Sequence, residues 1–202
     1  MTKELSNTLG DIAKHRILIL DGAMGTMIQQ YGLREEDFRG YRYRKTPGLM
    51  KGNNDMLNLT RPDVIEDIHR KYLQAGADII STNTFSSQRV SQADYHLESA
   101  ARDMALAGAQ IARKVADEFS TATKPRFVAG SVGPTNKTCS MSPDVSNPAA
   151  RELDYATLRN DYLEQIDALA EGGVDAVLIE TVFDTLNAKA AIDAAKIGRA
   201  HV

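Results

Sequence analysis

The sequence predicts an α/β fold with a parallel sheet, because short apolar runs alternate with segments of helical periodicity. The apolar runs are nearly continuous in character, which is typical of strands covered on both faces. Four such runs occur in the 202 residues, at positions 16–20, 77–82, 127–132 and 174–180. Periodicity alone does not choose between a closed barrel and an open sheet. A closed (β/α)8 barrel usually takes about 250 residues, so a barrel would be represented here by about its first four βα units.

The segments between the four runs and after the last one carry the helical signals. Thr60 is a candidate N-cap before Pro62, an apolar stripe follows, and Gly76 stands where a C-cap glycine belongs. Residues 101–119 and 158–169 each align apolar side chains on one helical face. Asp184 is a candidate N-cap for a last helix that runs to about residue 195. We therefore treat residues 1–202 as one partial domain, without a second domain.

The composition excludes several classes of protein. The chain is 43% hydrophobic and 25% charged, with a net charge of -3, so neither disorder nor a nucleic-acid partner is expected. No apolar run is long enough for a membrane span or a signal peptide, which makes the cytoplasm the expected compartment. Cys139 is the single cysteine, and the four histidines show no metal-ligand spacing. No disulfide and no metal site within this chain are expected.

Polar residues at the strand ends are the candidate binding residues. Asp21, Thr82, Ser131 and Glu180 all fall at the carboxyl ends of predicted strands. Ligands of parallel α/β folds bind at that edge, whether the sheet is closed or open. Two carboxylates and two hydroxyls there suit a ligand with a cationic amine. Simpler explanations stay open, since Asp21 and Gly22 could be no more than a turn in which Asp21 caps a helix, and Glu180 could be no more than a cap of the next helix.

The turn after the first run offers a different chemistry. Gly22 and Ala23 are small, and their backbone N–H groups precede a helical segment near Met27. Such a turn can hold an anion, including an amino-acid carboxylate, at a helix start. The motif is not a P-loop, because the Gly-Lys-Ser/Thr ending is missing. A tight turn without a ligand explains the same residues.

Several long motifs, in the same order, resemble those of the homocysteine S-methyltransferase family. They occupy residues 19–27, 51–62, 76–85 and 127–135. Residues 140–145 and 179–185 are similar to the cobalamin-dependent methionine synthase branch of that family. The resemblance extends from about residue 10 to about residue 197 and implies a (β/α)8 TIM-barrel fold. The last residues, Gly198 to Val202, do not resemble the continuation of the family, and we expect an interrupted barrel.

The resemblance also implies a function and a set of binding residues. Homocysteine would bind at the strand ends for methylation to methionine. The substrate contacts would come from Asp21 and Glu180 at the ammonium, the N–H groups of Gly22 and Ala23 at the carboxylate, and Thr82 and Ser131 along the pocket. In the family, zinc held by three cysteines binds the substrate thiol, and the methyl group comes from methylcobalamin, which is recharged from methyltetrahydrofolate on other domains.

The chain departs from the family pattern because it lacks the zinc-binding cysteines. The zinc cysteines of the family come from later strands, beyond residue 202, so we expect this chain to bind neither zinc nor cobalamin and to supply no catalytic residue of its own. Its partners would be homocysteine and the folate and cobalamin domains of the intact enzyme. Two alternatives remain. One is a cobalamin-free homocysteine methyltransferase that uses betaine or S-methylmethionine, against which residues 140–145 argue. The other is a non-catalytic amino-acid-binding fragment.

Overall fold

Three parallel strands form one sheet in a computed structural model that describes residues 8–198. The strands are β1 (Ile79–Ser81), β2 (Phe127–Val132) and β3 (Ala176–Ile179), and their spatial order is β1-β2-β3. Ile80 pairs with Val128, and Gly130 pairs with Val177. The predicted α/β class with a parallel sheet is confirmed, and it is consistent with part of a TIM-barrel-like domain. The sheet does not close among residues 8–198, so the closed barrel itself is not shown.

The prediction of four strands is wrong for the first run, residues 16–20. Only Leu20 forms a bridge, in parallel with Ile79. The carbonyl of Ile19 accepts the N–H groups of Asp78 and Ile79 at 2.8 and 3.1 Å. The segment therefore lies beside β1, where the predicted order places it, but it is too irregular for a ladder. Its apolar side chains have little to pack against, since 88% of Ile17 and 59% of Ile19 remain exposed.

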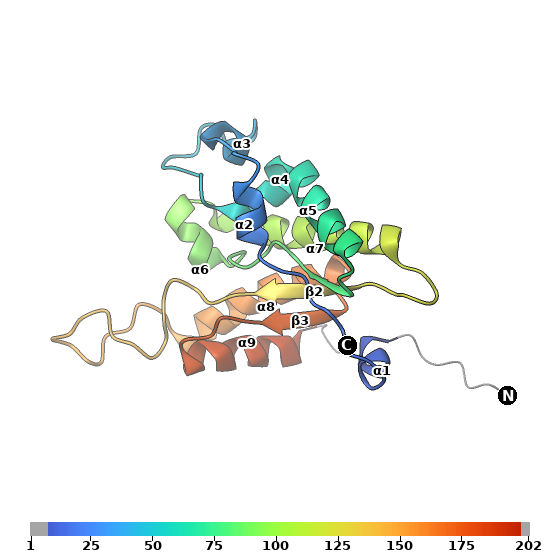
Figure 1. Ribbon diagram of the computed structural model, residues 1–202. Helices are drawn as coiled ribbons and strands as arrows, with labels where there is room; N and C mark the ends of the chain where they lie inside the picture. Colours follow the sequence, from blue (N-terminus) through green and yellow to red (C-terminus); the bar gives the residue numbers. More distant parts are fainter. Residues whose placement is uncertain (1–7, 199–202) are drawn as a thin grey trace.

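Four long helices cover the sheet, close to the positions that the periodicity predicts. α5 (Pro62–Ala75) and α7 (Ala101–Phe119) contact β1, α7 and α8 (Tyr155–Glu171) contact β2, and α9 (Thr185–Ile197) contacts β3. Figure 1 shows α8 and α9 beside the strands, with α5 and α7 above them in the view. Within residues 8–198, no helix combines the length and the apolar character that a membrane crossing needs.

Two of the predicted helix boundaries are confirmed and one is wrong. Gly76 ends α5 in the left-handed conformation (φ 111°), which costs glycine little. Asp184 caps α9 by accepting the N–H groups of Leu186 and Asn187. Thr60 does not cap α5. It is the last residue of a preceding short helix, and its Oγ1 donates to the carbonyl of Met56 at 3.3 Å.

Short helices fill the connections on either side of β1, and of these only the helical segment near Met27 was expected from the sequence. They hold the irregular segments in place, and several supply residues to the cavity described below. Before β1 and α5 come α1 (Leu9–Ala13), α2 (Met24–Gln29), α3 (Glu35–Arg39), η1 (Asn54–Met56) and α4 (Leu57–Thr60), and after β1 come α6 (Arg89–Gln92), η2 (Ala93–Tyr95) and η3 (Glu98–Ala100).

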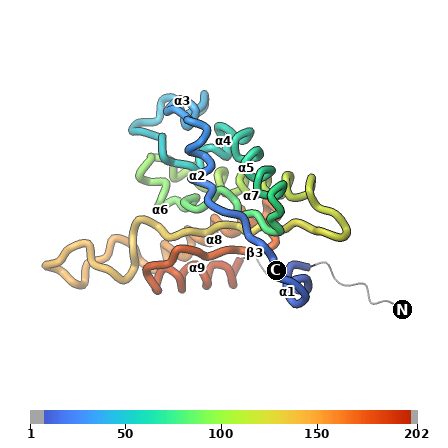
Figure 2. The backbone as a smooth tube through the Cα atoms, viewed as in Figure 1, coloured from blue at the N-terminus to red at the C-terminus, as the bar shows by residue number. Residues whose placement is uncertain are grey.

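Alternate strand residues point to opposite sides of the sheet, which separates the core from the cavity. Ile80, Val128 and Val132 are buried against the helices. Burial of each such side chain contributes about 1.5–3 kcal/mol to stability. Ser81 and Ser131, one position along, face a cavity at the carboxyl ends of the strands. The backbone trace in Figure 2 also shows the long loop that follows β2 and extends away from that end of the sheet.

Candidate functional site

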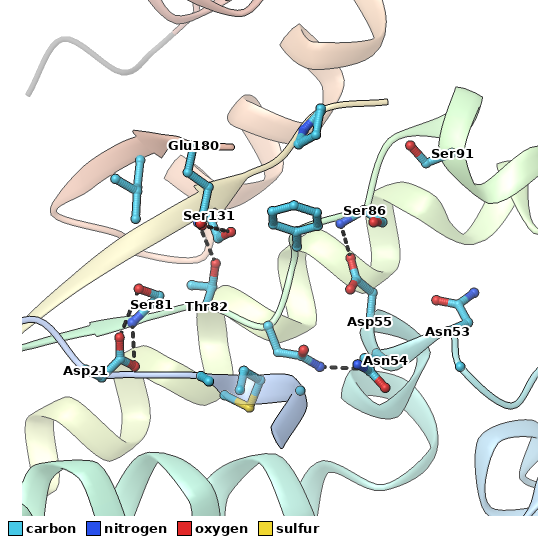
Figure 3. A pocket seen from close by; sticks show the side chains of 18 of the residues that line it. Asp21, Asn53, Asn54, Asp55, Ser81, Thr82, Ser86, Ser91, Ser131 and Glu180 are labelled. Carbon is cyan, nitrogen blue, oxygen red and sulfur yellow. Dashed lines mark hydrogen bonds between the residues drawn. The ribbon is translucent and has the colours of Figure 1, made fainter. Parts of the chain in front are cut away.

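A cavity with a volume of about 620 Å³ lies at the carboxyl ends of the strands. This edge of the sheet is where parallel α/β proteins bind ligands. The structure brings all six predicted binding residues to its wall. They are Asp21, Gly22, Ala23, Thr82, Ser131 and Glu180, and Figure 3 shows the side chains of Asp21, Thr82, Ser131 and Glu180 around one space.

Asp21 is held by Ser81, the last residue of β1. The Ser81 N–H donates to Oδ2 of Asp21 at 2.9 Å, and the Ser81 hydroxyl donates to Oδ1 at 3.0 Å. Burial raises the pKa of Asp21 to about 6, the two Ser81 hydrogen bonds oppose that rise, and the nearby Glu180 adds to it. Asp21 does not cap α2, whose N-cap residue is Ala23. The reading of Asp21 as a helix cap is therefore excluded.

Glu180 directly follows β3 and continues its pairing with β2, since its N–H donates to the carbonyl of Val132 at 3.1 Å. The Ser131 hydroxyl donates to Oε1 of Glu180 at 2.7 Å. On the other side, Thr82 Oγ1 accepts the N–H of Ser131 at 2.9 Å. Glu180 is not the cap of α9, because Asp184 has that role. Its carboxylate is thus available at the cavity wall.

The turn at Gly22 and Ala23 leaves backbone donors at the cavity. Within residues 8–198, neither N–H group makes a hydrogen bond. Tyr72 of α5 supports the turn, as its hydroxyl donates to the carbonyl of Ala23 at 3.3 Å. A Cβ at position 22 would lie 3.2 Å from that hydroxyl oxygen, which explains the small residue there. The two free N–H groups can donate hydrogen bonds to an anionic group of a ligand.

A second group of polar residues lines the cavity and was missed by the sequence analysis. Asp55 is buried, and its Oδ2 accepts the N–H of Ser86 and the hydroxyl of Ser87, both at 2.7 Å. Burial raises the pKa of Asp55 to about 6. In Figure 3, Asp55 and Ser86 lie together, apart from the two serine–carboxylate pairs. Residues 51–62 form one of the family-like motifs, but no periodicity in residues 51–56 indicates that Asp55 faces the cavity.

The cavity wall is acidic. Among the lining residues that the structure describes, four are carboxylates (Asp21, Asp55, Asp94 and Glu180), and none is a lysine, an arginine or a histidine. At the wall, the side-chain amide of Asn136 donates to Asp94 Oδ2 at 2.7 Å. Such a wall attracts a ligand that carries a positive charge, because opposite charges interact strongly where water is partly excluded.

The described residues do not fit a zinc ion. Zinc sites in proteins use three or four thiolate, imidazole or carboxylate ligands. Within residues 8–198, no group of three such side chains is close enough to hold a metal. Cys139 is buried in the loop after β2, its N–H donates to Asn187 Oδ1 at 3.0 Å, and burial raises the pKa of its thiol. Cys139 does not line the cavity, and the expectation that this chain binds no zinc stays a prediction.

The histidines are placed as surface or packing residues, where the structure describes them. His15 and His96 are exposed, and His69 is buried in α5. His201 lies outside the described residues.

Comparisons with known proteins agree on one family. Residues 18–201 match the sequence pattern described as Homocysteine S-methyltransferase. The fold is similar to solved structures of the homocysteine methyltransferase MmuM from Escherichia coli. The metallated form matches with a TM-score of 0.70 and 18% identity over 92% of this chain, and the oxidised form with 0.69 and 21% over 92%. The chain spans 61% and 60% of those two structures. At this identity, the structural likeness concerns the fold alone.

Proposed function

Because the chain belongs to the homocysteine S-methyltransferase family, we propose that its cavity binds homocysteine as the methyl acceptor. One observation carries the proposal. The same cavity is lined by two carboxylates and two free backbone N–H groups, although Asp21 and Glu180 are 159 positions apart in the sequence. Homocysteine carries an ammonium and a carboxylate on one carbon, so it needs both kinds of partner at short range.

The proposed binding mode assigns each predicted residue. Asp21 and Glu180 accept hydrogen bonds from the substrate ammonium, and the N–H groups of Gly22 and Ala23 donate to its carboxylate. Ser131 holds Glu180 in place through its 2.7 Å hydrogen bond, and Thr82 holds Ser131. Charge-assisted hydrogen bonds of this kind are about twice as strong as neutral ones. The amino acid would then lie with its side chain in the remaining space of the cavity.

For the whole protein, we propose that the product is methionine and that the methyl donor is methylcobalamin, recharged from methyltetrahydrofolate on further domains. The support is the resemblance of residues 140–145 and 179–185 to the cobalamin-dependent branch. Zinc, where the family binds it, keeps a coordinated thiol deprotonated, but the described residues do not offer its ligands. The part of this chain in the reaction is therefore to bind and orient the amino acid.

Titration calorimetry tests the binding site. Homocysteine should bind to the purified full-length protein with one site per chain. The analogue 4-mercaptobutyrate, which lacks the amino group, should bind far more weakly, because Asp21 and Glu180 then face no cation. Absence of binding heat with homocysteine would favour a structural fragment without a ligand. Equal affinity for the two compounds would show that Asp21 and Glu180 do not recognise the amino group.

The donor is tested separately, by the formation of methionine. The full-length protein is given homocysteine with methylcobalamin, S-methylmethionine or betaine in parallel reactions. Methionine from methylcobalamin supports the proposed donor. Methionine only from S-methylmethionine or betaine supports the cobalamin-free alternative, and homocysteine binding without methionine from any donor supports the non-catalytic one.

A further inference from the structure

Ser81 contacts both oxygens of one carboxylate at the cavity wall. Its N–H and its hydroxyl donate to Oδ2 and Oδ1 of Asp21, at 2.9 and 3.0 Å. The strand fixes Ser81 itself, because Ser81 is in register with Ala129 of β2 and the neighbouring Ile80 is completely buried. Two donors from one rigid residue fix both the position and the rotation of the Asp21 carboxylate (Figure 3).

The other charged and titratable groups that act on Asp21 disfavour its ionised form. Glu180, from the segment after β3, raises the pKa of Asp21 by charge repulsion. Tyr72, from α5, also interacts with Asp21. Within residues 8–198, neither Tyr72 nor any residue that lines the cavity brings a positive charge. Burial acts in the same direction as Glu180. Among the described residues, the interactions that favour the carboxylate are hydrogen bonds, and those from another residue come from Ser81 alone.

We propose that Ser81 is a positioning residue that orients the Asp21 carboxylate and keeps it ionised for the ammonium of the substrate. The inference rests on the proposed homocysteine site for its functional meaning. Ser131 acts on Glu180 through a single hydroxyl bond, so the Ser81–Asp21 pair is the more strongly constrained of the two. Ser81 does not react with the substrate in this proposal. Its effect reaches the substrate through Asp21.

A carbon NMR titration of the Asp21 carboxyl group tests the charge effect without any ligand. Ser81→Ala removes the hydroxyl and keeps the N–H bond, and Ser81→Thr keeps both donors. We expect Ser81→Ala to raise the pKa of Asp21 from about 6 to about 7, a tenfold change in its protonation equilibrium. Ser81→Thr should leave the pKa near the wild-type value. An unchanged pKa of Asp21 in Ser81→Ala would overturn the inference, whatever the ligand of the cavity is.

Ser146→Ala is the matched control. Ser146 also donates its N–H and its hydroxyl to one aspartate, Asp144, at 2.8 and 2.6 Å, but in the exposed loop after β2. It lines no part of the cavity. The pKa of Asp21 should be the same in Ser146→Ala as in the wild type. A shift of similar size in both variants would show a general effect of serine removal and would contradict the specific role of Ser81.

Calorimetry with homocysteine at three pH values tests the consequence for binding. If ionised Asp21 is needed, the changed protonation equilibrium should weaken binding by Ser81→Ala about fivefold at pH 6 and about twofold at pH 7, with little loss at pH 8. If Ser81→Ala lost the same factor of affinity at all three pH values, the loss would not come from the charge of Asp21. Ser81 would then have only a structural role. If the wild type binds no homocysteine, the proposed function fails, and the NMR titration still decides the role of Ser81.

Discussion

The hydroxyl of Ser131 donates a 2.7 Å hydrogen bond to Oε1 of Glu180, and this bond connects β2 to the segment that follows β3. The N–H of the same serine donates to Thr82, just after β1. Three neighbouring strand ends are thereby linked at one edge of the sheet. The link turns the Glu180 carboxylate toward the cavity that Asp21 lines from the other side.

Charge-neutral replacements of these carboxylates should weaken the binding of homocysteine. Asp21→Asn and Glu180→Gln keep the shape of each side chain and remove its charge, so the substrate ammonium loses one partner. Loss of one partner of a buried charge pair costs about 2–5 kcal/mol. Calorimetry on the full-length variants measures the change. Asp103→Asn is the control, because Asp103 pairs with Arg42 on the surface and does not line the cavity. Wild-type affinity in both cavity variants would show that the substrate assignment is wrong.

The parts of the fold that depend on local rules could be predicted from the sequence. A glycine in the left-handed region ends α5, and an aspartate caps α9, as their positions indicate. The sequence also predicted that Asp21, Thr82, Ser131 and Glu180 lie at one edge of the sheet, because the carboxyl ends of parallel strands share an edge. To predict these positions, it is enough to know where each strand lies, which way it runs and which residue follows it.

The parts that depend on neighbours in space could not be predicted. The apolar pattern of residues 16–20 predicts a strand. A strand, however, must pair with its neighbour over several residues, and in this segment only Leu20 pairs, with Ile79. Asp55 reaches the cavity because η1 and the segment after β1 meet through its bonds to Ser86 and Ser87. Neither segment shows a period, so no pattern in the sequence brings the two together.

Gly133→Ala should destabilise the protein and disturb the cavity. A Cβ at position 133 would lie 2.6 Å from the carbonyl oxygen of Phe85 and 2.8 Å from its ring. Phe85 lines the cavity, and its carbonyl accepts the Gly133 N–H at 3.0 Å. Overpacking of this kind costs about 1–3 kcal/mol. Denaturant unfolding measures the loss, and Gly10→Ala is the control, because nothing lies within 4 Å of its added Cβ. Equal stability of the two variants would contradict the close packing of Phe85 on Gly133.

His69 should make the protein sensitive to acid. The side chain is completely buried, and neither ring nitrogen has a hydrogen-bond partner in the part of the chain that the structure describes. Burial lowers the pKa of His69 to about 4 from a value of 6.5, against a weak opposing effect of Glu66. The unfolded chain therefore binds a proton below pH 6.5 that the folded chain does not bind until about pH 4. Stability falls as the pH drops through that window, by up to roughly 3 kcal/mol.

His69→Leu removes the titrating group and should flatten this part of the pH dependence. Denaturant unfolding at pH 7, 6, 5 and 4.5 measures the free energy of unfolding of both proteins. The advantage of the variant over the wild type should grow at each step toward acid. His15→Leu is the control, since His15 is exposed. A constant difference between His69→Leu and the wild type across the range would mean that His69 does not titrate differently in the folded state.

The 202-residue chain on its own should associate or unfold easily. The segment 16–20 at one edge leaves Ile17 88% exposed, and just beyond β3 at the other edge Phe183 is 61% exposed. Open strand edges with apolar side chains are templates for pairing with another chain. Light scattering at several concentrations should show a rising mass. Ile17→Lys should reduce the association more than Val145→Lys, since Val145 is exposed on the loop after β2. A sharp cooperative melt from a monomer would contradict this prediction.

The 202-residue chain should neither bind zinc tightly nor form methionine by itself. Its sequence holds one cysteine, Cys139, which is buried and bonded through its backbone to Asn187, away from the cavity. Within residues 8–198, no three His, Cys, Asp or Glu side chains lie close enough together to hold a metal ion. Without a metal, a free thiol of pKa about 8.5 stays mostly protonated at neutral pH, so the nucleophile is scarce even where the amino acid is held. Metal analysis of the dialysed chain should find no stoichiometric zinc, and added methylcobalamin should yield no methionine. Stoichiometric zinc, or methionine formation that a chelator abolishes, would mean that the metal ligands lie within these 202 residues after all.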